Sequence, residues 1–337
     1  GGSPLDYAIF AALSDDDSES AITLEGSARI IGDVGTNASH PNAINFEWST
    51  GINDGNLWVG PEADIANIVN SKRPDYLEHF SKGKGIDRLP ATATYTTPPF
   101  PTFPEFPGPR NDFTTNWVPG EYYSINEDGV YNKISVTSNR TLTIDLKGGV
   151  RIIRAREIDI KGKVELINVG QNGKLILYVE DSFTATSGSR VNTIGEGAGR
   201  PETLSLYIAG QEPFGGTLPS SYHQFHFTGS VVTKDAPILL GASSIFTGNI
   251  ITDAKTVNIG GAGDLTKAVV FAPKAHVKLG GSGGSGAIVA NSLHASGAAK
   301  IVYNEDVVNS ESVGGVMNPD DGEAPVKYRR GKWYGGV

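Results

Sequence analysis

The sequence has no cysteine, a single methionine and no long apolar run among its 337 residues. Without cysteine the chain forms no disulfide, thiolate nucleophile or Cys-ligated zinc site. No stretch approaches the roughly 18 consecutive apolar residues that identify a membrane-spanning helix. No signal peptide is recognisable either, and Gly1-Gly2-Ser3 resembles a cloning remnant. We therefore expect a piece of an exported protein whose export signal and anchor were removed.

Basic residues are also in short supply. The 28 lysines and arginines face 37 acidic residues, which leaves a formal charge of −9 and a pI near 5.2. A dedicated nucleic-acid-binding protein needs a basic face that displaces counterions. The composition therefore predicts no nucleic-acid partner.

What the chain has in abundance is glycine, 43 residues, and a short repeat in its C-terminal half. Phe227–Val232 recurs as Phe246–Ile251 after nineteen positions. Asn258–Gly261 recurs as Lys278–Gly281 after twenty, and the Phe271-Ala272-Pro273 segment is echoed eighteen positions later. This period is too short for a helix–turn–helix repeat, and it suits one coil of a β-solenoid, whose strands stack on those of the next coil.

The middle of the chain shows the alternation typical of half-buried strands. Thr141–Leu146 and Glu157–Lys161 alternate with period two, and Lys174–Val179 has a counterpart in Thr203–Ile208. The gap between the last two contains Gly195–Gly199, which predicts an extruded loop. The sequence thus predicts an all-β fold, a β-solenoid (β-helix) with a long Pro/aromatic-rich loop insertion.

The predicted organisation is a single domain over residues 1–337, with N-terminal coils at 4–60 and main coils at 134–305. An irregular insert at 61–133 separates them, and a tail follows at 306–337. Within the insert, residues 61–85 have weak helical spacing that Pro74 would end. The proline-rich run 98–109 cannot form ladders, so we expect it to be extended.

Aromatic residues concentrate in this insert and define the candidate ligand-binding site. Long irregular loops in compact domains are often functional, and a flat aromatic array could stack on sugar rings. The alternative is that these side chains anchor the insert against the solenoid, which the spacing of three in Phe100, Phe103 and Phe106 suits. The candidates are Tyr95, Phe100, Phe103, Phe106, Phe113, Trp117, Tyr122 and Tyr123.

Catalytic signatures are weak. The acidic clusters Asp15–Asp17, Glu127-Asp128 and Asp320-Asp321 lie in turn-like contexts and lack the spacing of a calcium loop. The six histidines are scattered, and His223 and His226 would face opposite sides of a strand. We therefore predict no catalytic residues, no metal, no cofactor and no enzymatic activity.

Several short segments resemble the β-helical ectodomain of pilin-like, type IV pilus-associated bacterial proteins. They are Leu5–Ala11, Gly32–Asn37, Asn56–Pro61, Leu142–Leu146, Val270–Ala275 and Gly286–Leu293. The resemblance implies a β-helix displayed on the cell surface or a pilus, with pilus or surface proteins as partners. That family carries an N-terminal hydrophobic pilin helix, which this sequence lacks; membrane contact would require such an anchor. The resemblance carries no catalytic residues.

Two further likenesses bear on function. Ala8–Ala12 followed by Ile31–Thr36 is similar to the opening of a bacterial ice-binding β-solenoid family, although the threonines do not recur on successive coils as that function requires. A β-helix with a long aromatic loop also resembles, in layout, the tāpirin-like cellulose-binding adhesins. We expect an extracellular, non-catalytic adhesin for insoluble plant cell-wall polysaccharide such as cellulose. The alternatives are a structural minor-pilin-like subunit, a polysaccharide lyase or hydrolase, and an ice-binding protein.

Overall fold

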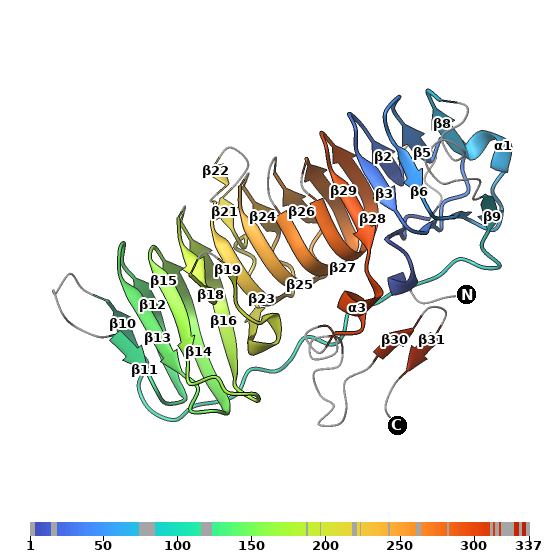
Figure 1. Ribbon diagram of the computed structural model, residues 1–337. Coiled ribbons are helices and arrows are strands. Elements are labelled where there is room, and N and C mark those ends of the chain that lie inside the picture. The colour runs from blue at the N-terminus through green and yellow to red at the C-terminus, as the bar shows by residue number, and fades with distance from the viewer. Residues whose placement is uncertain are drawn as a thin grey trace.

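The computed structural model describes residues 4–14, 19–73, 85–115 and 123–310, except 187, 196, 218–220, 223, 242, 261–263 and 282. It also describes 313, 317, 327–329 and 332–334. The structure is 52% strand and 6% helix, and 25 of the strands in the described residues belong to one large sheet whose neighbours pair in parallel. The all-β prediction is confirmed, and Figure 1 shows the strands stacked into an elongated body.

The main stack is built from long strands that each pair in parallel with the next. These are β12 (Gly129–Val136), β14 (Val150–Ile160), β16 (Lys174–Ala185), β20 (Leu204–Ile208), β23 (His226–Thr233), β25 (Ile245–Thr252), β27 (Asp264–Gly280) and β28 (Gly283–Ser296). Shorter strands form parallel rows beside them: β11 (Tyr123–Ile125), β13 (Thr141–Asp145), β15 (Lys163–Ile167), β17 (Arg190–Val191), β24 (Ile238–Leu240) and β26 (Thr256–Ile259).

Residues related by the sequence repeat lie opposite each other on adjacent strands. Phe227 lies opposite Phe246, and their rings stack with centroids 5.5 Å apart. Asn258 lies opposite Lys278, and Phe271 opposite Val289. The matched segments of β16 and β20 are likewise paired, with Leu175 opposite Leu204. The repeat therefore predicted the pairing partners correctly, because residues one period apart occupy equivalent positions on adjacent strands.

The N-terminal strands do not precede the main stack but continue it beyond β28. β1 (Ile9–Ala11) and β2 (Ile22–Leu24) both pair with β28, and β3 (Arg29–Ile31) pairs with β29 (Lys300–Tyr303). Further parallel pairings add β4 (Val34–Thr36), β5 (Ile44–Phe46), β6 (Gly51–Asn53), β7 (Leu57–Val59), β8 (Val69–Ser71) and β9 (Ile86–Arg88). In Figure 1 the blue N-terminal strands follow the red C-terminal ones.

A connector of residues 89–110, called the strap below, then returns the chain to the opposite end of the stack. It contains no helix or strand and leads from β9 to β10 (Asn111–Thr114), which pairs with β12. Figure 1 shows it running along the flank of the strands. The prediction of an irregular insert over 61–133 was too wide, because β8 to β11 and the start of β12 lie inside it. These are mostly strands of three or four residues, too short to show a period.

The predicted helix over 61–85 is confined in the described residues to α1 (Ile65–Ile68), whose N-cap Asp64 accepts a hydrogen bond from the Ala66 amide. Pro74 lies outside the described residues. The other elements in the part of the chain that the structure describes are η1 (Pro4–Asp6), η2 (Pro201–Thr203), α3 (Glu305–Val308) and three antiparallel ribbons. The ribbons are β18–β19 (Thr193–Ile194, Gly197–Ala198), β21–β22 (Gly216–Thr217, Ser221–Tyr222) and β30–β31 (Lys327–Arg329, Lys332–Tyr334). The first ribbon occupies the loop predicted around Gly195–Gly199.

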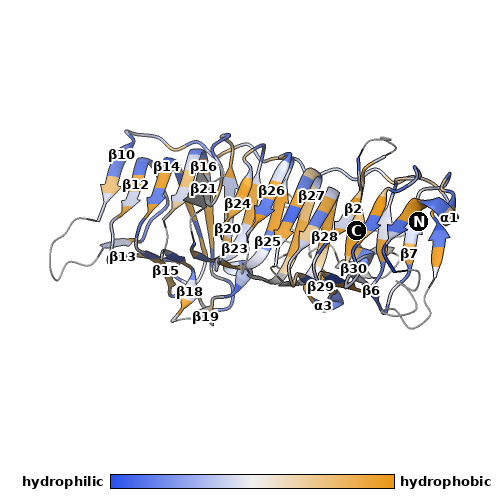
Figure 2. Cartoon of the chain, turned by 90° about the horizontal axis from the view of Figure 1, so that it is seen from above, coloured by the Kyte–Doolittle hydropathy of each residue, from blue (hydrophilic) through white to orange (hydrophobic). Residues whose placement is uncertain are grey.

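Two apolar clusters stabilise this arrangement. The larger runs along the inside of the stack, where equivalent positions such as Leu206, Val231 and Ile250 are fully buried in one continuous column. The smaller lies on the outer face of the sheet, beneath η1, α3 and the strap, and includes Phe10, Val289 and Phe271. Apolar and polar residues alternate along the strands in Figure 2. The strap therefore covers an apolar outer face that would otherwise meet water.

Candidate functional site

The strap aromatics predicted as ligand contacts pack against the sheet. The Tyr95 ring meets Phe10 edge-on with centroids 5.1 Å apart. Phe100 lies 6.2 Å from Tyr207, and Phe103 lies 5.0 Å from Tyr178. All three strap side chains are half-buried in the smaller apolar cluster. Burial raises the pKa of the Tyr95 phenol, and raises that of the adjacent Tyr7 to about 12.

Polar contacts fasten the strap at intervals. The buried Asn37 side chain accepts a hydrogen bond from the Ala93 amide at 2.7 Å and donates one to the Ala93 carbonyl. Thr97 donates to Asp253 at 2.8 Å, and Arg154 donates to the Pro104 carbonyl at 2.9 Å. These contacts satisfy backbone groups of a segment that forms no ladder. They fit the anchoring interpretation of the insert.

The other candidates are dispersed. Phe106 is half-buried in the strap, while Phe113 and Tyr123 pack against the larger core at the β10–β11 end. Trp117 and Tyr122 lie outside the described residues. The described candidates thus follow the length of the stack and do not gather into one aromatic platform. Sugar stacking by the eight candidates stays a prediction.

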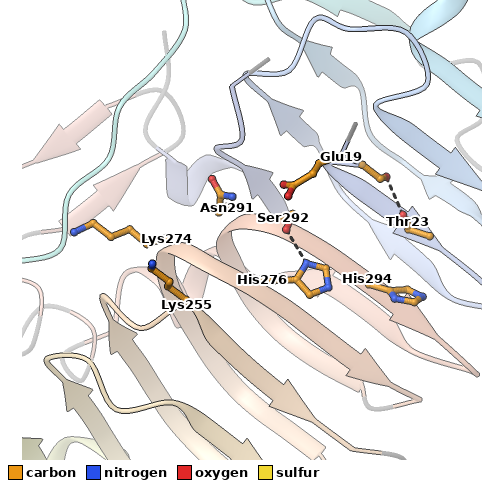
Figure 3. Close-up of a pocket in the computed structure, with 9 residues that line it drawn as sticks. Glu19, Thr23, Lys255, Lys274, His276, Asn291, Ser292 and His294 are labelled. Carbon is orange, nitrogen blue, oxygen red and sulfur yellow. Dashed lines mark hydrogen bonds between the residues drawn. The ribbon is translucent and has the colours of Figure 1, made fainter. Parts of the chain in front are cut away.

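A polar pocket of about 510 Å³ lies elsewhere, where β27, β28 and β2 stack side by side. Its volume is in the range of small-ligand sites, roughly 300–1,000 Å³. Figure 3 shows two lysines on one side and two imidazoles on the other. The lining residues are Glu19, Ser20, Thr23, Lys255, Lys274, His276, Asn291, Ser292 and His294. We call this the histidine pocket.

The strand register assembles the histidine pocket. His276 lies opposite Ser292, and its Nδ1 is 2.7 Å from the Ser292 hydroxyl oxygen. His294 lies opposite Thr23 on the next strand, and the Thr23 hydroxyl is 2.8 Å from that of Ser20. Neighbouring parallel strands are about 4.8 Å apart, so the pocket presents hydroxyl and imidazole groups at sugar-sized intervals.

The charges around the histidine pocket are partly compensated. Lys274 lies 3.6 Å from Asp253, the residue that also holds Thr97 of the strap. His294 Nε2 lies 3.0 Å from Glu25. Desolvation, reinforced by His294 and Lys278, holds the pKa of His276 below its usual value, although Glu19 acts in the opposite direction. His276 is therefore neutral at pH 7 and can both donate and accept a hydrogen bond.

Sequence reasoning missed this pocket because its members come from segments as distant as residues 19 and 294. The one available signal was the repeat, which aligns Lys278 with Asn258 and so marks the outward positions of successive strands. It did not show that β2 follows β28 in the stack. Among the described residues no three His, Asp or Glu side chains gather as a metal site would require. No described helix is long and apolar enough to cross a membrane.

Comparison of the sequence with protein-family models gives no match, and comparisons with curated proteins and with solved structures give none either.

Proposed function

We propose that the chain is a β-solenoid that acts as a non-catalytic binding module for polysaccharide, displayed on a bacterial surface or pilus. The solenoid is supported by the parallel pairing of residues one period apart through the whole stack. The surface location and a pilus or surface-protein partner rest on the family resemblance seen in the sequence. A rigid stack of this kind presents side chains at fixed intervals along its length.

The histidine pocket is the observation that carries the binding function. It is open, and hydroxyl, amide and imidazole groups that can donate or accept hydrogen bonds line it, as the hydroxyls of a sugar require. Glu19 is the one carboxylate among its described lining residues, whereas glycoside hydrolysis ordinarily uses two. This composition supports binding over hydrolysis. The neutral His276 keeps its hydrogen bonding available at pH 7.

Retention on insoluble polysaccharide tests the proposal. The full chain should be retained on cellulose, and His276→Ala combined with Asn291→Ala should weaken retention by about tenfold, the equivalent of one or two lost hydrogen bonds. Asn172→Ala, in the turn before β16, is the matched control, since Asn172 is exposed and lies several strands along the stack from the pocket. Binding isotherms measured by depletion from solution give the ratio.

The outcomes separate the alternatives. Equal retention of the double variant and the control would exclude the histidine pocket as the binding site. Loss of retention with Phe106→Ala, Trp117→Ala or Tyr122→Ala instead would assign binding to the strap region. No retention on any polysaccharide would favour the structural, minor-pilin-like subunit. Release of reducing sugar would favour an enzyme.

A further inference from the structure

A second pocket, of about 270 Å³, lies where the chain turns between the rows of strands near β13 and β15. Three of its seven lining residues are cationic: Arg140, Lys161 and Lys163. The other lining residues are Asn139, Thr141, Gly162 and Gly188. We call this site the basic corner. Its concentration of positive charge stands out on a chain of net charge −9.

The backbone holds these cations close together. The Lys163 amide donates to the Arg140 carbonyl at 2.9 Å, so the two turns lie against each other. A Cβ at Gly162 would stand only 2.1 Å from that carbonyl oxygen, so the close approach depends on glycine. Because consecutive turns are fixed at strand spacing, the backbones of Arg140 and Lys163 stay close together.

On the next strand, Arg190 lies directly opposite Lys163 and donates a hydrogen bond to the Gly195 carbonyl at 3.0 Å. The arginines of β14 have acidic partners: Arg151 lies 2.9 Å from Asp128, and Arg156 lies 3.2 Å from Asp181. The two lysines of the basic corner differ from them in this respect.

No carboxylate of a described residue lines the basic corner or forms an ion pair with Lys161 or Lys163. Both lysine side chains are exposed. Of the acids on the adjoining strands, Asp159 accepts a hydrogen bond from Thr184, and Asp145 accepts bonds from the Lys147 amide and Asn168. Glu165, two residues beyond Lys163 on β15, lies next to the basic corner and is not among its lining residues.

We propose that the basic corner binds the anionic oxygen group, a sulfate ester or a carboxylate, of an acidic polysaccharide. Two lysines and an arginine supply charge-assisted donors to such a group. Arg190 on the following strand continues the positive charge at a spacing of about 4.8 Å, as a chain with repeated anionic groups would need.

This site is independent of the histidine pocket, which lies near β27, β28 and β2, many strands along the stack. The test uses the full chain and titrates it with a sulfated oligosaccharide, an oligogalacturonate and a neutral cello-oligosaccharide of equal length. Lys161→Gln combined with Lys163→Gln should weaken binding of at least one anionic oligosaccharide by about tenfold or more. If binding of the sulfated oligosaccharide weakens, the bound group is a sulfate ester; if binding of the oligogalacturonate weakens, it is a carboxylate. Lys234→Gln combined with Lys300→Gln, exposed lysines elsewhere, is the matched control.

Binding to the anionic oligosaccharide should also weaken as salt rises, while the thermal midpoint of the double variant stays at the wild-type value. If the midpoint falls, the two single variants replace the double one. Three results would overturn the proposal: no binding of either anionic oligosaccharide, equal loss in the control variant, or a DNA oligomer bound as tightly with the same loss. Cellulose retention that survives the lysine substitutions leaves the histidine pocket intact, so the two proposals fail separately.

Discussion

Glycine determines how closely neighbouring strands approach at one level of the stack. Gly229 lies opposite Gly248, and Gly286 occupies the corresponding place on β28. Gly248 has φ +131°, and an added Cβ would stand 1.8 Å from the Gly229 carbonyl oxygen. Gly286 repeats this geometry with φ +151° and the Ala268 oxygen at 1.8 Å. Side-chain-bearing residues cannot adopt this conformation without strain.

Gly248→Ala should therefore be strongly destabilising. The backbone strain alone costs about 1–3 kcal/mol, and the clash with Gly229 adds to it. Gly149→Ala is the control, because its Cβ would meet no atom within 4 Å and its φ lies outside the left-handed region. Denaturant unfolding of both variants measures the difference. Equal unfolding free energies would show that β23 and β25 do not approach as closely as described.

Among the elements, the strap is attached to the sheet by aromatic contacts that alternate along it with hydrogen bonds. Phe103 contacts Tyr178 and lies beneath the Arg154 guanidinium, which is 5.6 Å from the ring centroid. Arg154 is mostly buried and also pairs with Glu180 at 3.1 Å. Arg154 of the sheet thus contacts both the Phe103 ring of the strap and the Glu180 carboxylate. The strap consequently acts as a cover whose loss exposes the smaller apolar cluster.

Phe103→Ala should lower the unfolding free energy by about 1–2 kcal/mol, because the side chain is half-buried and full burial of an aromatic side chain contributes about 1.5–3 kcal/mol. It should also speed proteolysis within residues 89–110. Thr102→Ala, an exposed neighbour in the same strap, provides the comparison. The anchoring interpretation would be contradicted if both variants unfolded alike and Phe103→Ala instead reduced cellulose retention.

At the scale of the whole molecule, the order of strands in space differs from the order in the chain. Residues 9–11 are flanked by residues 288–290 on one side and 34–36 on the other. The Ala8 carbonyl accepts a hydrogen bond from the Ile288 amide at 2.9 Å across this junction. The junction completes the stack without a covalent link between β28 and β1. The strap is what permits it, because it returns the chain to the far end.

Paired cysteines test this junction, and the absence of native cysteine makes the test clean. Ala11 lies opposite Ala290, so Ala11→Cys with Ala290→Cys places the two Cα atoms about 4.8 Å apart, within the range of a disulfide. Ala11→Cys with Ala272→Cys spans two strand spacings, about 9.6 Å, which is too far. The first pair should oxidise fully, stabilise the chain by several kcal/mol, on the order of 5, and increase its non-reducing gel mobility.

Thiol counting on the folded protein distinguishes the two pairs directly. Oxidation of the Ala11–Ala272 pair in preference to Ala11–Ala290 would contradict the described register. Failure of both pairs to oxidise would place the N-terminal strands away from β28.

The repeat and the alternation in the sequence predicted the strands of the main stack and their register. Phe227, Phe246, Asn258 and Lys278 could be paired in advance, because stacking requires equivalent residues at one repeat period, and alternation marked the buried side of each strand. The three-residue strands β8 and β9 could not be found, since three residues carry no period. The local signal was therefore strong for the main stack and weak at its ends.

Which distant segments became neighbours depended on long-range packing that the sequence pattern does not show. β1 and β2 pair with β28 because their strand edges are complementary, and no local sequence pattern shows this complementarity. The same is true of the histidine pocket, which joins Glu19 and Thr23 to His276, Ser292 and His294. The aromatic insert was recognisable in the sequence. Whether its rings faced solvent or the sheet depended on the apolar outer face beneath them. Because that face is buried by the strap, Tyr95, Phe100 and Phe103 point inward.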